Sequence, residues 1–171
     1  MNNREPESNE EAKEADEKQS ISQGKGFMKI NGSHKFKATS KQIYNAILDP
    51  RVLQSCIPGC TSVAYLDSDR IRADIAINLP GMNGNFGAII HIAERQEPNK
   101  LTLQVQRQGK AGSIDATSEI DIADEADGAL LTYNATADLA GAVAIANNPI
   151  GQGITKNTLN SFFEKLDKEL V

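Results

Sequence analysis

Cysteine and histidine are the residues of this sequence best suited to metal binding or nucleophilic chemistry, and their spacing argues against both. Cys56 and Cys60 lie close together, but His34 and His91 are far from them along the chain. A structural zinc site takes about four Cys or His ligands. This chain has only two cysteines and two histidines, and the histidines are not close to the cysteines in sequence, so we predict no metal site. Two reduced cysteines beside a turn are the simpler interpretation, because the sequence shows no sign of secretion.

Motifs of the common enzyme classes are missing from the sequence as well. It contains no G-x-S-x-G, P-loop or H-E-x-x-H pattern. Asp115, Glu119 and Asp121 alternate on a strand face that we expect to be solvated. His34 should point inward with Phe36, as a core histidine with a backbone partner or as a polar anchor for a ligand carbonyl. We therefore predict a protein without catalytic residues.

The composition predicts one globular domain behind an acidic tail. The chain has 171 residues, of which 39% are hydrophobic and 24% charged, and this suits a single folded domain. Residues 1–24 hold seven acidic and three basic residues, whereas the whole chain has a net charge of only −5. The sequence therefore predicts a disordered acidic tail over residues 1–26 and one domain over residues 27–171.

The charge and hydropathy of that domain disfavour several classes of partner and location. The domain is nearly neutral and lacks a clustered basic face, which argues against nucleic acid. The N-terminal residues lack the features of a secretory signal. No apolar run reaches the roughly 18–20 residues that span a bilayer. We expect a cytoplasmic protein whose contact with the cell membrane, if it makes one, is peripheral.

Apolar and polar residues alternate in six segments, and one further short segment lies between the first of them and the other five, which together predicts seven antiparallel strands. The first segment begins at Phe27, the second lies around Ser62–Leu66, and five more follow. Turn residues at Pro80-Gly81, Pro98-Asn99 and Asp127-Gly128 separate several of the later segments. Strands in unbroken succession, joined by tight turns, are typical of one antiparallel sheet.

Three helices complete the expected fold. Thr39 or Ser40 offers an N-cap for a short helix after the first strand, and Asp49-Pro50 starts a second one. The third is long and amphipathic, with Asn148-Pro149 at its start and Leu170 near its end. The fold class is therefore α+β, a curved antiparallel sheet of about seven strands wrapped around a long C-terminal helix, with two short helices after strand 1.

Small side chains on the inward faces of the strands favour a hollow between the sheet and the long helix. They are Ala73, Ala88, Ala116, Ser118, Ala135 and Ala137. An apolar hollow can take an apolar ligand; a dense core of small residues is the alternative. The candidate lining residues are His34, Phe36, Ile57, Pro58, Phe86, Ile90, Leu103, Val105, Ile120, Tyr133, Ile154 and Phe162.

Two further features lie near this expected hollow. Arg107 shares the inward face of its strand and is expected to reach the rim at the strand end. Residues 139–154 are apolar, uncharged and rich in glycine, which is typical either of a buried helix start or of a loop that touches a membrane or partner. Val143, Ile145 and Ile150 are the candidates for such a contact.

Several segments share a pattern with one protein family. They are Met28–Phe36, Leu48-Asp49-Pro50 with Val52-Leu53, Cys56-Ile57-Pro58-Gly59-Cys60, Gly109–Gly112, Leu131–Ala135 and Phe162–Leu166. With these segments the chain resembles the CoxG family of carbon monoxide dehydrogenase subunits over about residues 28–170. The segment from Cys56 to Cys60 is the most specific part of the resemblance.

The resemblance implies a helix-grip fold of the SRPBCC/START-like superfamily, whose members hold hydrophobic ligands between sheet and helix. It further implies an accessory to a molybdenum-containing carbon monoxide dehydrogenase or related hydroxylase, with a role in membrane recruitment or electron-acceptor delivery. A bound quinone or lipid would be its ligand, with no other cofactor. Two alternatives remain open: a small enzyme of the polyketide-cyclase type that uses His34 and Tyr133, and an assembly factor with a filled core.

Overall fold

The computed structural model describes residues 25–79, 82–109, 112–141, 143–144 and 149–170. The strands are β1 (Lys25–Phe36), β2 (Cys60–Asp67), β3 (Arg70–Leu79), β4 (Met82–Gln96), β5 (Lys100–Gly109), β6 (Gly112–Glu125) and β7 (Gly128–Ala140). The helices are α2 (Ser40–Ile47), α3 (Pro50–Cys56) and α4 (Pro149–Glu169). The predicted α+β fold class is confirmed. The predicted acidic tail lies almost entirely outside the described residues.

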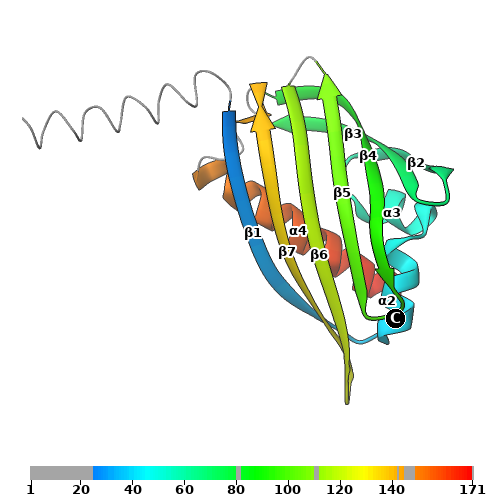
Figure 1. The fold of residues 1–171 in the computed structure, drawn as a ribbon. Coiled ribbons are helices and arrows are strands. Elements are labelled where there is room, and N and C mark those ends of the chain that lie inside the picture. Colours follow the sequence, from blue (N-terminus) through cyan, green and yellow to red (C-terminus); the bar gives the residue numbers. More distant parts are fainter. Residues whose placement is uncertain (1–24, 80–81, 110–111, 142, 145–148, 171) are drawn as a thin grey trace, which may run out of the picture.

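The strands form one antiparallel sheet in the order β1-β7-β6-β5-β4-β3-β2. β1 pairs with β7 along its whole length, from Lys25 opposite Ala140 to Phe36 opposite Ala129. Helices α2 and α3 carry the chain to the other edge of the sheet, after which each strand lies beside the next. Figure 1 shows the sheet curving around α4, which crosses its concave face. A curved sheet closed around one long helix is the helix-grip fold.

The two short helices begin at the caps that the sequence predicts. Thr39 caps α2 with a reciprocal pair: its side chain accepts from the backbone N–H of Gln42, and its own N–H donates to Gln42 Oε1 at 2.9 Å. Asp49 caps α3, accepting from the N–H of Arg51 at 3.0 Å, with Pro50 at the first helical position. These caps fix where the chain leaves β1 and where it turns toward β2.

Gly112 allows the close approach of strands at one end of the sheet. Its φ is +115°, a conformation that side chains rarely adopt, and a Cβ there would lie 1.8 Å from the backbone oxygen of Ala140. Ser113 pairs with Ala140 in the same place. The start of β6, the end of β7 and the start of β1 therefore meet at one end of the molecule (Figure 1).

Buried apolar side chains form two separate clusters on the concave side. The larger cluster joins α2, α3 and the C-terminal half of α4 to the sheet and includes Ile43, Leu53, Leu131, Phe163 and Leu166. Leu166 has no exposed surface, and truncating such a leucine to alanine typically costs about 2–5 kcal/mol of unfolding free energy. This end of the molecule is densely packed.

The smaller cluster lies at the opposite end, under the N-terminal half of α4. It consists of Ala137, Leu139, Val143 and Ala144, with Met28, Ile114 and Ala116 packed against it. Most of these side chains are short or lie at strand ends.

None of the described helices has the length and apolar character needed to cross a bilayer.

Candidate functional site

A cavity of about 340 Å³ lies between the concave face of the sheet and the N-terminal half of α4. Strands β1, β6 and β7 form one wall, α4 forms another, and Val143 also lines the cavity. The lining residues are Met28, Ile30, Ile114, Ala116, Ala135, Thr136, Ala137, Leu139, Val143, Ile154, Thr155, Thr158 and Leu159. A volume of this size is at the small end of the range of about 300–1,000 Å³ for ligand pockets.

Three alanines explain why the sheet leaves room at this position. Ala116 lies directly opposite Ala137 in the β6–β7 pairing, and Ala135 lies opposite Ile30 and Ser118. Facing side chains normally fill the space between a sheet and a helix. A methyl group reaches only the start of that space, so α4 cannot close the gap above these positions. Six small inward residues are expected to create the hollow, and three of them, Ala116, Ala135 and Ala137, line the cavity.

The helical wall is apolar despite its two threonines. Thr155 Oγ1 donates to the backbone oxygen of Gly151 at 2.8 Å, and Thr158 Oγ1 donates to that of Ile154 at 2.9 Å. Both hydroxyl hydrogens are thus used within α4 itself. The threonines offer the cavity no free donor, and Ile154 and Leu159 supply the remaining surface of this wall. The site suits a ligand with a hydrocarbon or ring body.

Of the predicted lining residues, the structure places Ile154 in the cavity wall. Most of the others belong to the larger cluster or pack against it: Phe36, Ile57, Ile90, Leu103, Ile120, Tyr133 and Phe162. The half-buried Pro58 lies in the loop after α3, and Val105 pairs with Ile90 and Ala116 across the sheet. The prediction selected large apolar residues, but large residues fill the concave face and close the hollow there.

Four of those predicted residues surround Phe163. Its ring centroid lies 5.8 Å from that of His34, 5.4 Å from those of Tyr133 and Phe162, and 6.1 Å from that of Phe36. The His34 ring contacts the rings of Phe36 and Phe163. Within the described part of the chain, it has these ring contacts in place of the expected backbone hydrogen bond. Burial raises the pKa of the Tyr133 hydroxyl, which keeps it neutral at pH 7. This group belongs to the packed end of the molecule.

Phe86 is buried at the edge of the concave face, beneath a guanidinium group. The Cζ atom of Arg107 lies 4.2 Å from the centroid of the Phe86 ring, in cation–π geometry. Arg107 is half-buried, and its Nη1 donates to the backbone oxygen of Gly112 at 3.1 Å. It therefore lies at the end of the sheet that holds the cavity, but its side chain is turned inward over Phe86 instead of extending to the solvated rim.

The predicted surface contact of Val143 requires a correction. Its side chain is only 2% exposed and packs with the smaller cluster, where it lines the cavity. The residue comes shortly after β7 and packs with Ala137 and Leu139, which removes it from solvent. Ile145 lies outside the described residues, and the side chain of Ile150 is likewise not described. The remaining contact candidates thus stay untested.

The two cysteines do not form a reactive centre. Both are free, and burial raises the pKa of each thiol above its ordinary value. The Cys60 thiol donates to the backbone oxygen of Ser62 at 3.5 Å. Among the described residues, no group of three or more His, Cys, Asp or Glu side chains could hold a metal ion.

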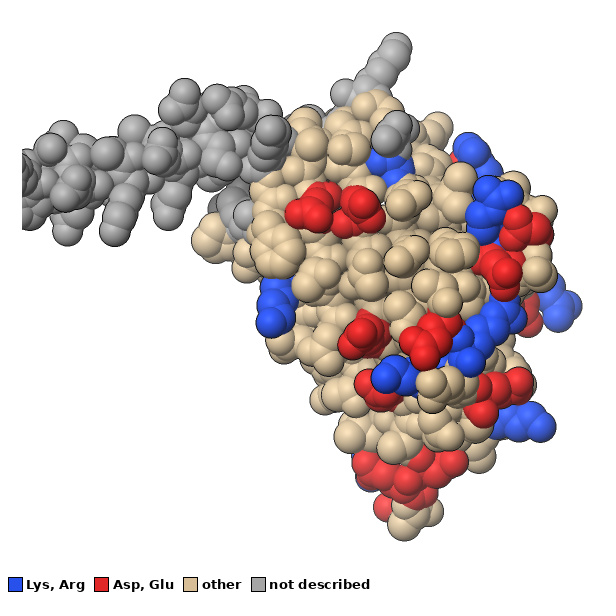
Figure 2. Space-filling model, in the orientation of Figure 1, with Lys and Arg blue, Asp and Glu red and all other residues tan. Residues whose placement is uncertain are grey.

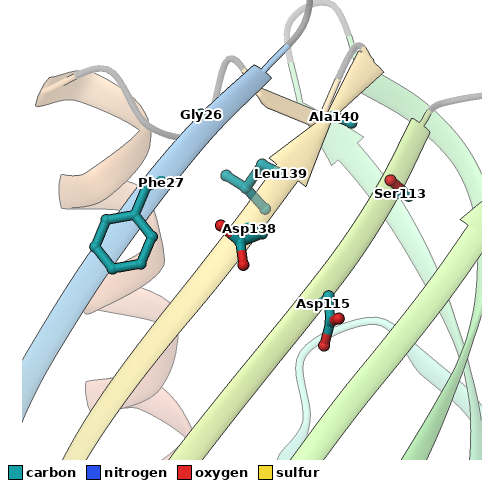
Figure 3. Close-up of a pocket in the computed structure, with 7 residues that line it drawn as sticks. All are labelled: Gly26, Phe27, Ser113, Asp115, Asp138, Leu139 and Ala140. Atoms are coloured by element: carbon teal, nitrogen blue, oxygen red, sulfur yellow. The ribbon is translucent and has the colours of Figure 1, made fainter.

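A second depression, of about 450 Å³, lies on the outer face of the sheet at the same end. Figure 3 shows Phe27, Asp115 and Asp138 on neighbouring strands there. Asp138 lies opposite both Phe27 and Asp115 in the pairing of the strands. Two carboxylates in this position favour water over an apolar ligand. On the part of this face that Figure 2 colours, basic side chains lie among acidic ones and form no continuous basic patch.

Comparison with known proteins gives one family match. The model of the CoxG family, described as a carbon monoxide dehydrogenase subunit, matches residues 32–171. No curated protein matches the chain.

Solved structures show similarity over most of the chain. A conserved protein from Geobacillus kaustophilus is 30% identical with a TM-score of 0.78, and the match covers 84% of this chain and 95% of that one. Protein CV1439 from Chromobacterium violaceum is 15% identical with a TM-score of 0.67, over 83% and 96% of the two chains. Ara h 8.0201 is 8% identical with a TM-score of 0.62, over 85% and 98%. The latter two support the fold alone.

Proposed function

The chain belongs to the CoxG family of carbon monoxide dehydrogenase subunits, and from that premise we propose that it is a non-catalytic binding protein for an apolar ligand. The family is that of an accessory subunit of carbon monoxide dehydrogenase. The proposed ligand is lipid- or quinone-like, and the proposed partner is a molybdenum-containing enzyme of this type. The observation that carries the proposal is the apolar cavity beneath the N-terminal half of α4.

The size and lining of the cavity limit what it can hold. About 340 Å³ accommodates one small ring with a single alkyl chain, and is too small for a whole two-chain phospholipid. The walls offer methyl and methylene groups from alanine, isoleucine and leucine, and the hydroxyl hydrogens of Thr155 and Thr158 are used within α4. Transfer of an apolar group from water into such a site is favourable by roughly 25 cal/mol per Å² of buried surface. A single-chain lipid or a short-chain quinone satisfies both limits.

Filling the cavity tests the proposal. Ala116→Leu adds three carbons to the cavity wall and should weaken binding of a decyl-substituted benzoquinone by at least about tenfold, since the two cannot share the space. Native mass spectrometry of the full chain measures the bound fraction. The free energy of unfolding of the variant should stay within about 1.5 kcal/mol of the wild-type value, because the added carbons enter empty space.

The adjacent residue provides the matched control. Thr117 lies on the opposite face of β6, so Thr117→Leu adds apolar volume outside the cavity and should leave binding unchanged. Equal losses in both variants would contradict a ligand site at Ala116. A wild-type protein that never retains an apolar molecule would instead support an assembly factor with a filled core.

The enzyme alternative has less support from the positions of its residues. His34 and Tyr133 both contact Phe163 in the packed cluster, and neither lines the cavity. Ala135, two residues further along β7, lines the cavity where Tyr133 does not. Turnover of a screened substrate that is lost in His34→Ala would favour an enzyme over a carrier.

We further propose that the cavity end of the molecule exchanges its ligand at a membrane or at the partner enzyme. Phe27, at the start of β1, is 58% exposed at this end and can contact an apolar surface. Flotation with zwitterionic vesicles should retain wild-type protein and lose about half of the Phe27→Ser variant. Vesicles that retain neither protein would leave the partner enzyme as the place of exchange.

A further inference from the structure

Arg107 is a charged residue that shares the concave face of the sheet with the cavity wall. It lies directly opposite Ile114 in the β5–β6 pairing, and Ile114 lines the cavity. Side chains opposite each other on one face of a sheet are in contact range, with Cβ atoms about 4.5–5.5 Å apart. The next inward position of β5, Val105, lies opposite Ala116, which also lines the cavity. Arg107 is not itself a lining residue of the cavity, but it lies one strand away from Ile114, on the same face of the sheet.

The guanidinium group is held in a fixed position by three features. It lies over the Phe86 ring at 4.2 Å, and its Nη1 donates to the Gly112 backbone oxygen. A Cβ at Gly109 would lie 2.9 Å from Nη2, so the glycine leaves the space that the side chain occupies. A planar guanidinium held on an aromatic ring loses little freedom when it donates a further hydrogen bond.

One buried donor nitrogen of this fixed group is unpaired within the described part of the chain. Arg107 Nε is buried and has no hydrogen-bond partner among the described residues. The residues that the structure describes also include no carboxylate in an ion pair with Arg107. A buried donor on a charged group is costly to leave unpaired, and such groups in folded proteins are normally satisfied. The N–H of Arg107 and its positive charge therefore favour an acceptor at the border of the apolar cavity.

From this geometry we infer that Arg107 binds the polar head of the cavity's ligand through Nε–H. The ligand class is then an apolar ring or chain that carries one hydrogen-bond acceptor, either a carboxylate or a quinone carbonyl. The inference rests on the proposed function, since it places the ligand body in the same cavity. It adds a specificity-determining residue: hydrocarbons of the same size without an acceptor should bind less tightly.

Two probes with the same body separate the head from the tail. Decylbenzoquinone carries carbonyl acceptors, and decylbenzene has the same ring and chain without them. Arg107→Met keeps most of the side-chain length but removes the donors and the charge. We expect it to weaken decylbenzoquinone binding by about tenfold and to change decylbenzene binding by less than about twofold. Unchanged decylbenzene binding also shows that the variant is folded with its cavity intact.

A third probe and two further variants complete the experiment. Dodecanoate replaces the carbonyl with a carboxylate, and a larger loss for dodecanoate than for the quinone in Arg107→Met would name an anionic head. Arg107→Lys keeps the charge without Nε and should restore dodecanoate binding only in part. Arg72→Met removes an exposed guanidinium that pairs with Asp74, and should leave the binding of all probes unchanged.

The outcomes distinguish this inference from the function on which it rests. Equal losses for decylbenzoquinone and decylbenzene in Arg107→Met, or no loss for either quinone or dodecanoate, would overturn the role of Arg107 and leave the apolar carrier intact. Wild-type protein that binds none of the three probes would overturn the proposed function and this inference together.

Discussion

Ser40 and Asp124 are 84 residues apart in sequence and are joined by two hydrogen bonds. The backbone N–H of Ser40 donates to Asp124 Oδ1 at 2.8 Å, and its hydroxyl donates to Asp124 Oδ2 at 2.7 Å. The first N–H groups of a helix have no partner within the helix. A carboxylate on β6 therefore satisfies the start of α2 and ties the helix to the sheet, while Ser40 itself is almost fully buried.

The charge of Asp124 makes this link dependent on pH. The two hydrogen bonds from Ser40 lower the pKa of the Asp124 carboxyl below its ordinary value. A lowered pKa in the folded state stabilises the protein above the unfolded-state pKa of about 3.9, and this stabilisation is lost as pH falls through the folded-state value. Asp124→Asn should thus lower the midpoint of urea unfolding at neutral pH.

The difference between wild type and Asp124→Asn should shrink as the pH falls below about 4, because the carboxyl of the unfolded state is then protonated and that of the folded state follows at its lowered pKa. Urea unfolding at several pH values measures it. Asp127→Asn is the control, since Asp127 is an exposed carboxylate in the turn before β7. A difference that stays constant down to pH 2 would contradict the role of the charge.

Side-chain size explains why the site was harder to predict than the core. Alternation along each strand correctly placed Phe36, Ile120 and Tyr133 on the concave face, because only the polarity pattern is needed for that. A hollow forms where side-chain volume is missing between the sheet and the helix. It therefore depends on which small residues lie opposite each other on neighbouring strands. Ala116 and Ala137 became neighbours only once the register of β6 and β7 was known.

At the scale of elements, the two halves of α4 have different structural roles. Its C-terminal half is anchored: Phe163 and Leu166 are buried, and Asp167 Oδ1 accepts from the backbone N–H of Lys37 at 3.1 Å. Its N-terminal half contains Gly151 and Gly153 and faces the cavity. Glycine is among the weakest helix formers. This half thus has both weaker intrinsic helicity and fewer packed neighbours.

Replacing Gly153 with alanine should stabilise the protein. A Cβ at this position meets no atom within 4 Å, and glycine within a helix costs about 0.5–1 kcal/mol relative to alanine. Gly153→Ala should therefore raise the free energy of unfolding by roughly this amount, as measured by urea denaturation.

Gly112→Ala provides the opposite case in the same measurement. The positive φ alone should cost about 1–3 kcal/mol, and the contact of the new Cβ with the Ala140 backbone oxygen adds to it. A stabilised Gly112→Ala variant, or a Gly153→Ala variant that loses stability, would contradict the described backbone at that position.

The elements themselves followed from local signals in the sequence. Period-two alternation predicted six of the strands, which have one more buried and one more solvated face, whereas β2 is largely exposed and does not alternate. Capping residues at Thr39 and Asp49 marked the two short helices because their side chains satisfy the first N–H groups. The strand order and the half of α4 that would face a hollow depend on contacts between distant segments, which no local pattern contains.

For the whole molecule, one consequence follows from the separation of the two buried clusters. Parts of a domain that share few buried contacts can unfold locally while the rest stays folded. The larger cluster fixes one end of the molecule, whereas the N-terminal half of α4 rests mainly on the smaller cluster and the cavity. Local opening of this half would uncover the cavity without global unfolding.

Amide hydrogen exchange should therefore form a gradient along α4. We expect the amides of residues 154–159 to exchange at least about tenfold faster than those of residues 163–166, because a difference of only about 1.4 kcal/mol in opening free energy produces that ratio. A ligand in the cavity should slow exchange in the first group only, by stabilising the closed state. Uniform protection along α4 would mean that the helix opens as one unit. A gradient would make the first turns of α4 the entrance, with ligand entry limited by how often they open.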